Sequence, residues 1–156
     1  MSAPADNLVP FRKQSFTGKR RQIESRPALA LGWPTTTKAR YEVFDAWHKI
    51  AMREARTNGV GRDFLAVARI VMRWNRGEII DTSAELAERA GGCHPETIKR
   101  EIAQHARLGT IIIHGSAKRR SDGGMIRTRT IRLSIPADLD PSNGIDGIEY
   151  DEGDLT

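Results

Sequence analysis

The chain has 156 residues, of which 38% are hydrophobic, enough for one modest core but not for a second sizeable domain. Its single cysteine, Cys93, excludes an intramolecular disulfide framework, and no apolar run marks export or a membrane span, so a reducing cytoplasm is the expected compartment. All 25 Lys and Arg lie before Pro136, whereas 7 of the 20 Asp and Glu lie after it, which leaves residues 1–135 with a net charge of +12 and favours a polyanionic partner.

The first 35 residues are expected to form a disordered basic arm. Six cations stand there among Ser, Thr, Gln, Gly and Pro without any sustained hydrophobic period: Arg12, Lys13, Lys19, Arg20, Arg21 and Arg26. Such an arm either keeps the protein in solution or contacts phosphates, and both interpretations stay open. Its apolar stretch, from Ala28 to Trp33, could dock the arm on the folded domain.

The folded domain is expected over residues 36–136 and begins with two helices. The first carries one apolar stripe and ends at Asn58-Gly59; the stripe consists of Phe44, Trp47, Ala51 and Ala55. The second is predicted from about Arg62 to Asn75, with Gly77 as its stop. It is apolar around most of its circumference, which marks it as the central core helix: Phe64, Leu65, Val67, Ala68, Ile70, Val71, Met72 and Trp74.

Two features of these helices leave alternatives open. The polar strip of the second helix holds Arg69, Arg73 and Arg76, which at this spacing could reach a phosphate backbone or form a solvated face. The stripe of the first helix is not needed to close a minimal core, so it either forms the interface of a symmetric dimer or packs on the second helix within one monomer. Residues 78–81 then predict a short strand.

Residues 84–103 are predicted to form two short helices around a tight turn. Thr82 or Ser83 can cap the first helix with Glu85 in a capping box, and the Gly91-Gly92 pair ends it where φ must be positive. The second helix is predicted over residues 95–108, with Pro95 at its first position. At 100° per residue its packing face holds Ile98, Ile102, His105 and Ala106, and its opposite, basic face holds Glu96, Lys99, Arg100, Ala103 and Arg107.

After Gly109 the hydrophobic period changes from 3.6 to 2. Ile111 and Ile113 alternate with Ile112 and His114, and the later run Ile131, Leu133 and Ile135 alternates with Thr130, Arg132 and Ser134, which predicts two paired strands. Between them, residues 116–124 form a Gly-rich tip with three consecutive cations, Lys118, Arg119 and Arg120. The chain is therefore predicted to be an α+β domain that closes with a β-hairpin carrying a basic loop.

These residues resemble a known family. The pattern Leu86-Ala87, Ala90-Gly91, Thr97-Ile98-x-Arg100-x-Ile102 and Leu108-Gly109-x-Ile111 resembles the winged helix-turn-helix domains of bacterial, phage and plasmid transcription regulators and replication initiators. The turn Gly-Gly-Cys-His-Pro is one residue longer than the usual form of that family. The resemblance implies sequence-specific binding of duplex DNA, with transcriptional regulation as the expected role and replication or partition as the alternative.

The resemblance also implies which residues would meet DNA. The second motif helix would enter the major groove and present His94, Glu96, Thr97, Lys99 and Arg100 to the bases. Arg100 or Lys99 would read guanine, and Glu96 could accept from cytosine. The expected backbone contacts are Arg69, Arg73, Arg107, Lys118, Arg119, Arg120, Arg127 and Arg129.

Residues 137–156 are expected to form a disordered acidic tail. They hold seven carboxylates and no cation, with Ile145, Ile148, Tyr150 and Leu155 spaced among them. Three interpretations compete for this tail: a solubilising segment, an internal mimic of DNA that screens the basic face, and a peptide that a partner protein binds.

Other classes of function find less support. Cys93, His94, His105 and His114 lack the spacing of a zinc site, and the paired carboxylates look solvated, so neither a metal, a cofactor nor an enzyme activity is expected. RNA is disfavoured because no aromatic residues stand on the predicted strands. A protein-interaction scaffold is the rival from another class, but residues 99–132 hold nine Lys and Arg against Glu101 and Asp122.

Overall fold

A computed structural model describes residues 23–119 and 121–139, without the side chains of residues 116–119 and 125–127. This part of the chain is a mixed α+β structure with four helices and a small antiparallel four-stranded sheet. In chain order the elements are β1 (Ala28–Ala30), α1 (Thr37–Asn58), α2 (Asp63–Val71), β2 (Glu78–Ile79), α3 (Ser83–Arg89), α4 (Pro95–Leu108), β3 (Ile111–Arg119) and β4 (Met125–Pro136). The predicted order of elements from α1 to β4 is confirmed.

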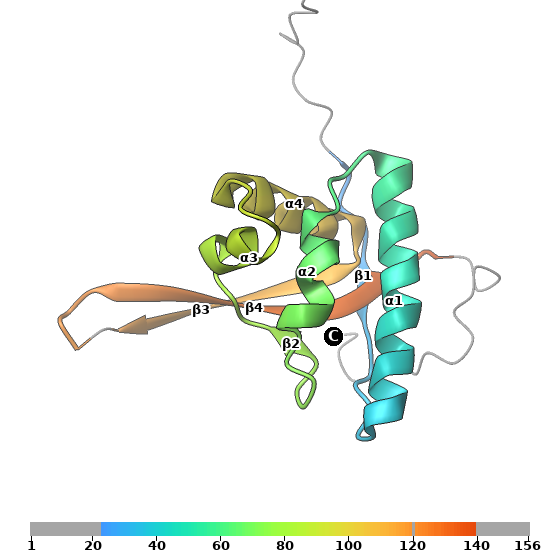
Figure 1. Cartoon of the computed structure of the whole chain (residues 1–156), viewed down its shortest axis with the longest axis horizontal. Coiled ribbons are helices and arrows are strands. Elements are labelled where there is room, and N and C mark those ends of the chain that lie inside the picture. The colour runs from blue at the N-terminus through green and yellow to red at the C-terminus, as the bar shows by residue number, and fades with distance from the viewer. Residues whose placement is uncertain (1–22, 120, 140–156) are drawn as a thin grey trace, which may run out of the picture.

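Strand β4 pairs with each of the other three described strands. Along its length β3 pairs with it from Arg119↔Met125 to Ile111↔Leu133, while β2 pairs with residues 131–132 and β1 with residues 134–136 of β4. The β3–β4 hairpin projects far beyond the helices (Figure 1). Its strands are longer than predicted, because residues 116–119 belong to β3 and not to a loop. The basic run therefore begins on the strand itself.

Helix α1 crosses the domain and supplies its largest buried side chains. Thr36 caps its N-terminus, Gly59 ends it at φ +67°, and it packs against α2, α4 and β4. Phe44 is 1% exposed, and Trp47 is fully buried with its indole N–H donating to the Thr110 carbonyl at 2.7 Å. The stripe is therefore buried within one monomer, as the second alternative predicted, and it is not available as a dimer interface. Dimerisation itself stays a prediction.

Helix α2 is shorter than predicted. It ends at Val71, and the chain then turns back on itself, with the Arg73 N–H donating to the Glu78 carbonyl at 2.9 Å. Gly77 makes the turn possible at φ +68°, and an added Cβ there would lie 2.5 Å from the Trp33 ring. Arg73 and Arg76 thus lie beyond the helix, and the expected row of three arginines along it does not form. Ile70, expected in the core, is 65% exposed.

Residues 23–35 are not disordered, contrary to the prediction for the arm. β1 pairs with β4 from Ala28↔Pro136 to Ala30↔Ser134, and Leu31 is buried in the core. The Arg26 guanidinium bridges Glu54 and Asp138, at 2.5 Å and 2.7 Å. The apolar stretch docks, as its composition allowed, because it completes the hydrogen bonds of an otherwise open strand edge. Residues 1–22 and 140–156, predicted as basic arm and acidic tail, lie outside the described part.

Candidate nucleic-acid interface

Helices α3 and α4 form a contacting pair whose ends are set by local hydrogen bonds. The Thr82 hydroxyl accepts from the Glu85 N–H at 3.2 Å and donates to its carboxylate at 3.1 Å, which fixes the start of α3. Gly91 and Gly92, at φ +93° and +87°, form the turn. His94 then caps α4 with its Nδ1, which accepts from the Glu96 N–H at 3.1 Å, and Pro95 follows at the first helical position, as predicted.

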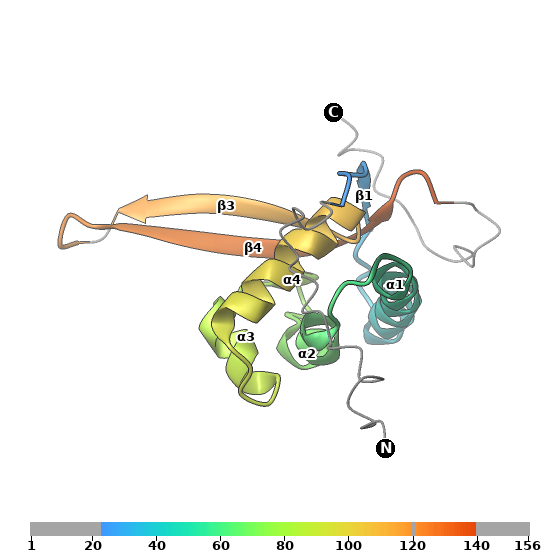
Figure 2. The ribbon, with the colours of Figure 1, turned by 90° about the horizontal axis from the view of Figure 1, so that it is seen from above.

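The two faces of α4 differ as the sequence predicted. Its inner face is buried against the domain: Ile98, Glu101, Ile102, His105 and Leu108. Its outer face is exposed and carries Glu96, Lys99, Arg100, Ala103 and Arg107. In Figure 2, α3, α4 and the β3–β4 hairpin lie on one side of the molecule and α1 on the other. Helix α4 and the projecting hairpin therefore lie on the same side of the molecule.

Two polar residues on the inner face of α4 fix the loop between α1 and α2. The Glu101 carboxylate accepts from the Phe64 N–H at 3.1 Å and so caps the start of α2, while His105 Nε2 lies 3.1 Å from the Gly61 carbonyl. Burial raises the pKa of Glu101 and lowers the pKa of His105 to about 4. The sequence predicts neither polar contact: it marks Glu101 only as a charge, and His105 as part of a packing face and of a set without the spacing of a zinc site.

The five predicted base-contacting residues are brought together on the first turns of α4. Glu96, Lys99 and Arg100 are exposed, and no described residue forms an ion pair with them. His94 is also exposed, but its Nδ1 is occupied by the cap, so only its Nε2 is open to a partner. Thr97 is half-buried at the edge of this face.

Three of the predicted backbone-contacting arginines lie on the helices α2 and α4 or directly after α2, and they differ in whether a protein group already binds them. Arg107 is exposed on α4, although one of its N–H groups donates to the Ile23 carbonyl at 3.1 Å, and Arg73 is exposed in the turn after α2. Arg69 pairs with Asp45 at 2.5 Å, and its guanidinium lies 5.0 Å from the Tyr41 ring centre on the α1–α2 surface. Arg69 therefore has a carboxylate partner within the protein, and its contact with a phosphate stays a prediction.

Arg129, predicted to contact the DNA backbone, is held by hydrogen bonds within the protein. Its guanidinium donates to the Asp81 carbonyl and the Ser83 hydroxyl, at 3.1 Å and 3.2 Å, and so ties the hairpin to the start of α3. Burial lowers the pKa of this group, and its Nε is buried with no partner among the described residues. Arg129 therefore ties the hairpin to the start of α3, and its contact with a phosphate stays a prediction.

The remaining predicted contacts lie at the far end of the hairpin. Lys118 and Arg119 belong to β3 and Arg127 to β4, with Lys118 opposite Ile126 and Arg127 opposite Ala117. Their side chains, and Arg120 as a whole, lie outside the described part. The backbone register alone places this cationic run at the distal end of the hairpin.

The described residues form neither a metal site nor a membrane-spanning helix. No three His, Cys, Asp or Glu side chains of residues 23–119 and 121–139 are grouped so that they could hold a metal ion. None of the helices there combines the length and the apolar character that a membrane crossing needs. Comparisons with protein families, with curated proteins and with solved structures find no match for this chain.

Proposed function

We propose that this protein is a winged helix-turn-helix protein that binds duplex DNA and regulates transcription. The observation that carries the proposal is the outer face of α4, where Lys99 and Arg100 stand exposed and without ion-pair partners in the described chain. The order α2, β2, α3, α4, β3, β4 supports the family resemblance of the motif residues. In this assignment α3 and α4 are the two helices of the motif and the β3–β4 hairpin is the wing.

The dimensions of α4 suit the major groove. Its 14 residues span roughly 21 Å, and a groove about 12 Å wide accepts a single helix. Entering with its N-terminus, α4 would present Glu96, Lys99 and Arg100 to base edges. The partial positive charge at that end of the helix also favours an approach to phosphates.

The wing would hold the complex in register. A hairpin that projects beyond the helices can follow the phosphate backbone while α4 lies in the groove. Lys118, Arg119 and Arg120 carry the positive charge for that contact. Arg129, through Asp81 and Ser83, would set the angle between the wing and the helix pair.

The test begins by selecting a preferred duplex from a random library and measuring binding against salt. With five or more phosphate contacts, the slope of log K against log salt should be about −4 to −5 or steeper. Arg100→Ala should cost about 1–3 kcal/mol on the selected duplex and relax base choice at one position. Lys49→Ala removes an exposed cation on α1 and is the matched control, with affinity expected to stay unchanged. A slope near zero, or an Arg100→Ala protein that binds like wild type, would refute the proposal.

A further inference from the structure

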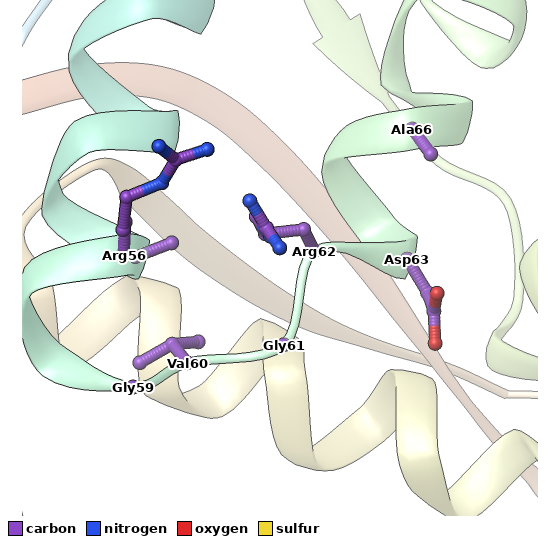
Figure 3. A pocket seen from close by; sticks show the side chains of 8 residues that line it. Arg56, Gly59, Val60, Gly61, Arg62, Asp63 and Ala66 are labelled. Atoms are coloured by element: carbon purple, nitrogen blue, oxygen red, sulfur yellow. The ribbon is translucent and has the colours of Figure 1, made fainter.

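A hollow of about 660 Å³ lies where α1 ends and α2 begins, away from the outer face of α4. Its walls are the last turn of α1 and the first turn of α2, and the connecting segment Gly59–Arg62 forms its base. Figure 3 shows Arg56 reaching from α1 and Arg62 reaching from the start of α2 into the same space. The hollow therefore collects two positive charges from two different helices.

Both guanidinium groups lack a counter-charge. Neither Arg56 nor Arg62 forms an ion pair or a hydrogen bond through its side chain with any described residue. The carboxylate in the lining, Asp63, points to the other side of the start of α2 in Figure 3. By contrast Arg26, Arg69 and Arg129 each have a protein partner.

Arg62 stands where a cation is locally unfavourable. It is the N-cap of α2, a position that favours Ser, Thr, Asp or Asn, and its own side chain accepts nothing from the first turn of the helix. The helix end itself carries a partial positive charge, so the guanidinium of Arg62 and the dipole of α2 repel each other. Arg56, at the C-terminal end of α1, is well placed for its own helix but adds a second cation to the same hollow. An anion in the hollow would offset the charges of both guanidinium groups.

The base of the hollow is held firmly. Gly61 packs so closely on α4 that an added Cβ would lie 2.8 Å from the Glu101 carboxyl group, and its carbonyl is bound by His105. The Phe64 N–H is bound by Glu101. Because these contacts fix the connecting segment, the backbones that carry Arg56 and Arg62 are pre-positioned before a ligand arrives.

We propose that this hollow binds a phosphate group through Arg56 and Arg62. Guanidinium groups form paired, charge-assisted hydrogen bonds with the oxygens of a phosphate. Two of them match the double negative charge of a free phosphate or phosphomonoester and exceed the single charge of a backbone phosphate. The phosphate has two possible sources, a free phosphate or phosphomonoester and the backbone of the bound nucleic acid. The free source does not depend on the proposed function, and it is tested without DNA.

The experiment is calorimetric titration of the full chain with inorganic phosphate at constant ionic strength, alongside binding of random-sequence duplex DNA. The variants are Arg56→Gln and Arg62→Gln, which keep most of each stem. Lys38→Ala, an exposed cation at the other end of α1, is the control. All sites are on the surface, and an unchanged thermal midpoint will verify that each variant is folded.

We expect saturable phosphate binding that weakens at least tenfold in both arginine variants and stays unchanged in the control. If phosphate does not bind but both arginine variants lose affinity for random duplex DNA, the site exists and its phosphate comes from the nucleic-acid backbone. If neither ligand distinguishes the arginine variants from the control, the proposal is overturned.

Discussion

Acidification should destabilise the protein through His105, and the structure allows the effect to be sized. Nε2 faces the Gly61 carbonyl and must donate to it, so the proton of the neutral ring lies on Nε2. Nδ1 is buried and has no partner among the described residues, so a second proton placed there would find no acceptor. Burial therefore lowers the pKa of His105 to about 4 from its ordinary 6.5.

Stability falls with pH because the unfolded chain takes up a proton at His105 before the folded chain does. As pH falls through 6.5 the unfolded chain protonates this residue, while the folded chain does not until about pH 4. His105 therefore makes its full contribution to the free energy of unfolding above pH 6.5, and this contribution is lost progressively as the pH falls below 6.5. The loss is about 2 kcal/mol between pH 7 and pH 5 and reaches about 3 kcal/mol below pH 4.

Urea unfolding at pH 7 and pH 5, followed by tryptophan fluorescence, measures the loss. His105→Gln is the reference, because its amide can still donate to the Gly61 carbonyl but does not titrate. Both proteins share every other titrating group, including Glu101, whose burial-raised pKa works in the opposite direction. Wild type should lose about 2 kcal/mol more than His105→Gln between the two pH values. If both proteins lose the same amount, the buried neutral imidazole is not the cause.

Three further changes test the packing around the proposed interface. Trp47→Phe removes the buried indole N–H that donates to the Thr110 carbonyl, which keeps the Ser134 N–H as its other donor. Loss of this hydrogen bond and of the larger ring should lower the free energy of unfolding by about 1–3 kcal/mol, measured in urea. Gly109→Ala should cost about 1–2 kcal/mol by thermal unfolding, because φ is +83° and the new Cβ would lie 3.1 Å from the Pro27 carbonyl oxygen; an unchanged midpoint would contradict this. Arg129→Ala should destabilise the protein by about 1–3 kcal/mol and weaken all duplexes alike, as fluorescence anisotropy would show; a loss confined to the selected duplex would speak against its structural role.

Local signals predicted α4 and its surroundings well. Gly91, Gly92 and Pro95 carry conformational information that acts within a few residues, and the 3.6-residue period separates the two faces of the helix without knowledge of the rest. The predicted base-contacting residues lie together for the same reason. Whether they meet DNA is a question that local pattern does not answer.

The failures of prediction come from contacts between residues far apart in sequence. β1 has only three residues, and its stability comes from an edge of β4 more than a hundred positions away. The period of α2 continues through Trp74, yet the helix stops at Val71. The Arg73 N–H then bonds the distant Glu78 carbonyl and closes a turn at Gly77, against which the Trp33 ring packs. Arg129 was expected to face phosphate because its partners, Asp81 and Ser83, cannot be foreseen from its own strand.

The pairing of β1 with the end of β4 brings the two boundaries of the described domain together. Ala28 lies opposite Pro136, and the Arg26 side chain holds Asp138 across the same junction. A domain closed in this way can be inserted into a surface loop of a host protein without forcing the ends of that loop apart. It is equally suited to circular permutation: a short linker can join residues near 23 and 139, and new termini can open at the exposed turn around Gly123.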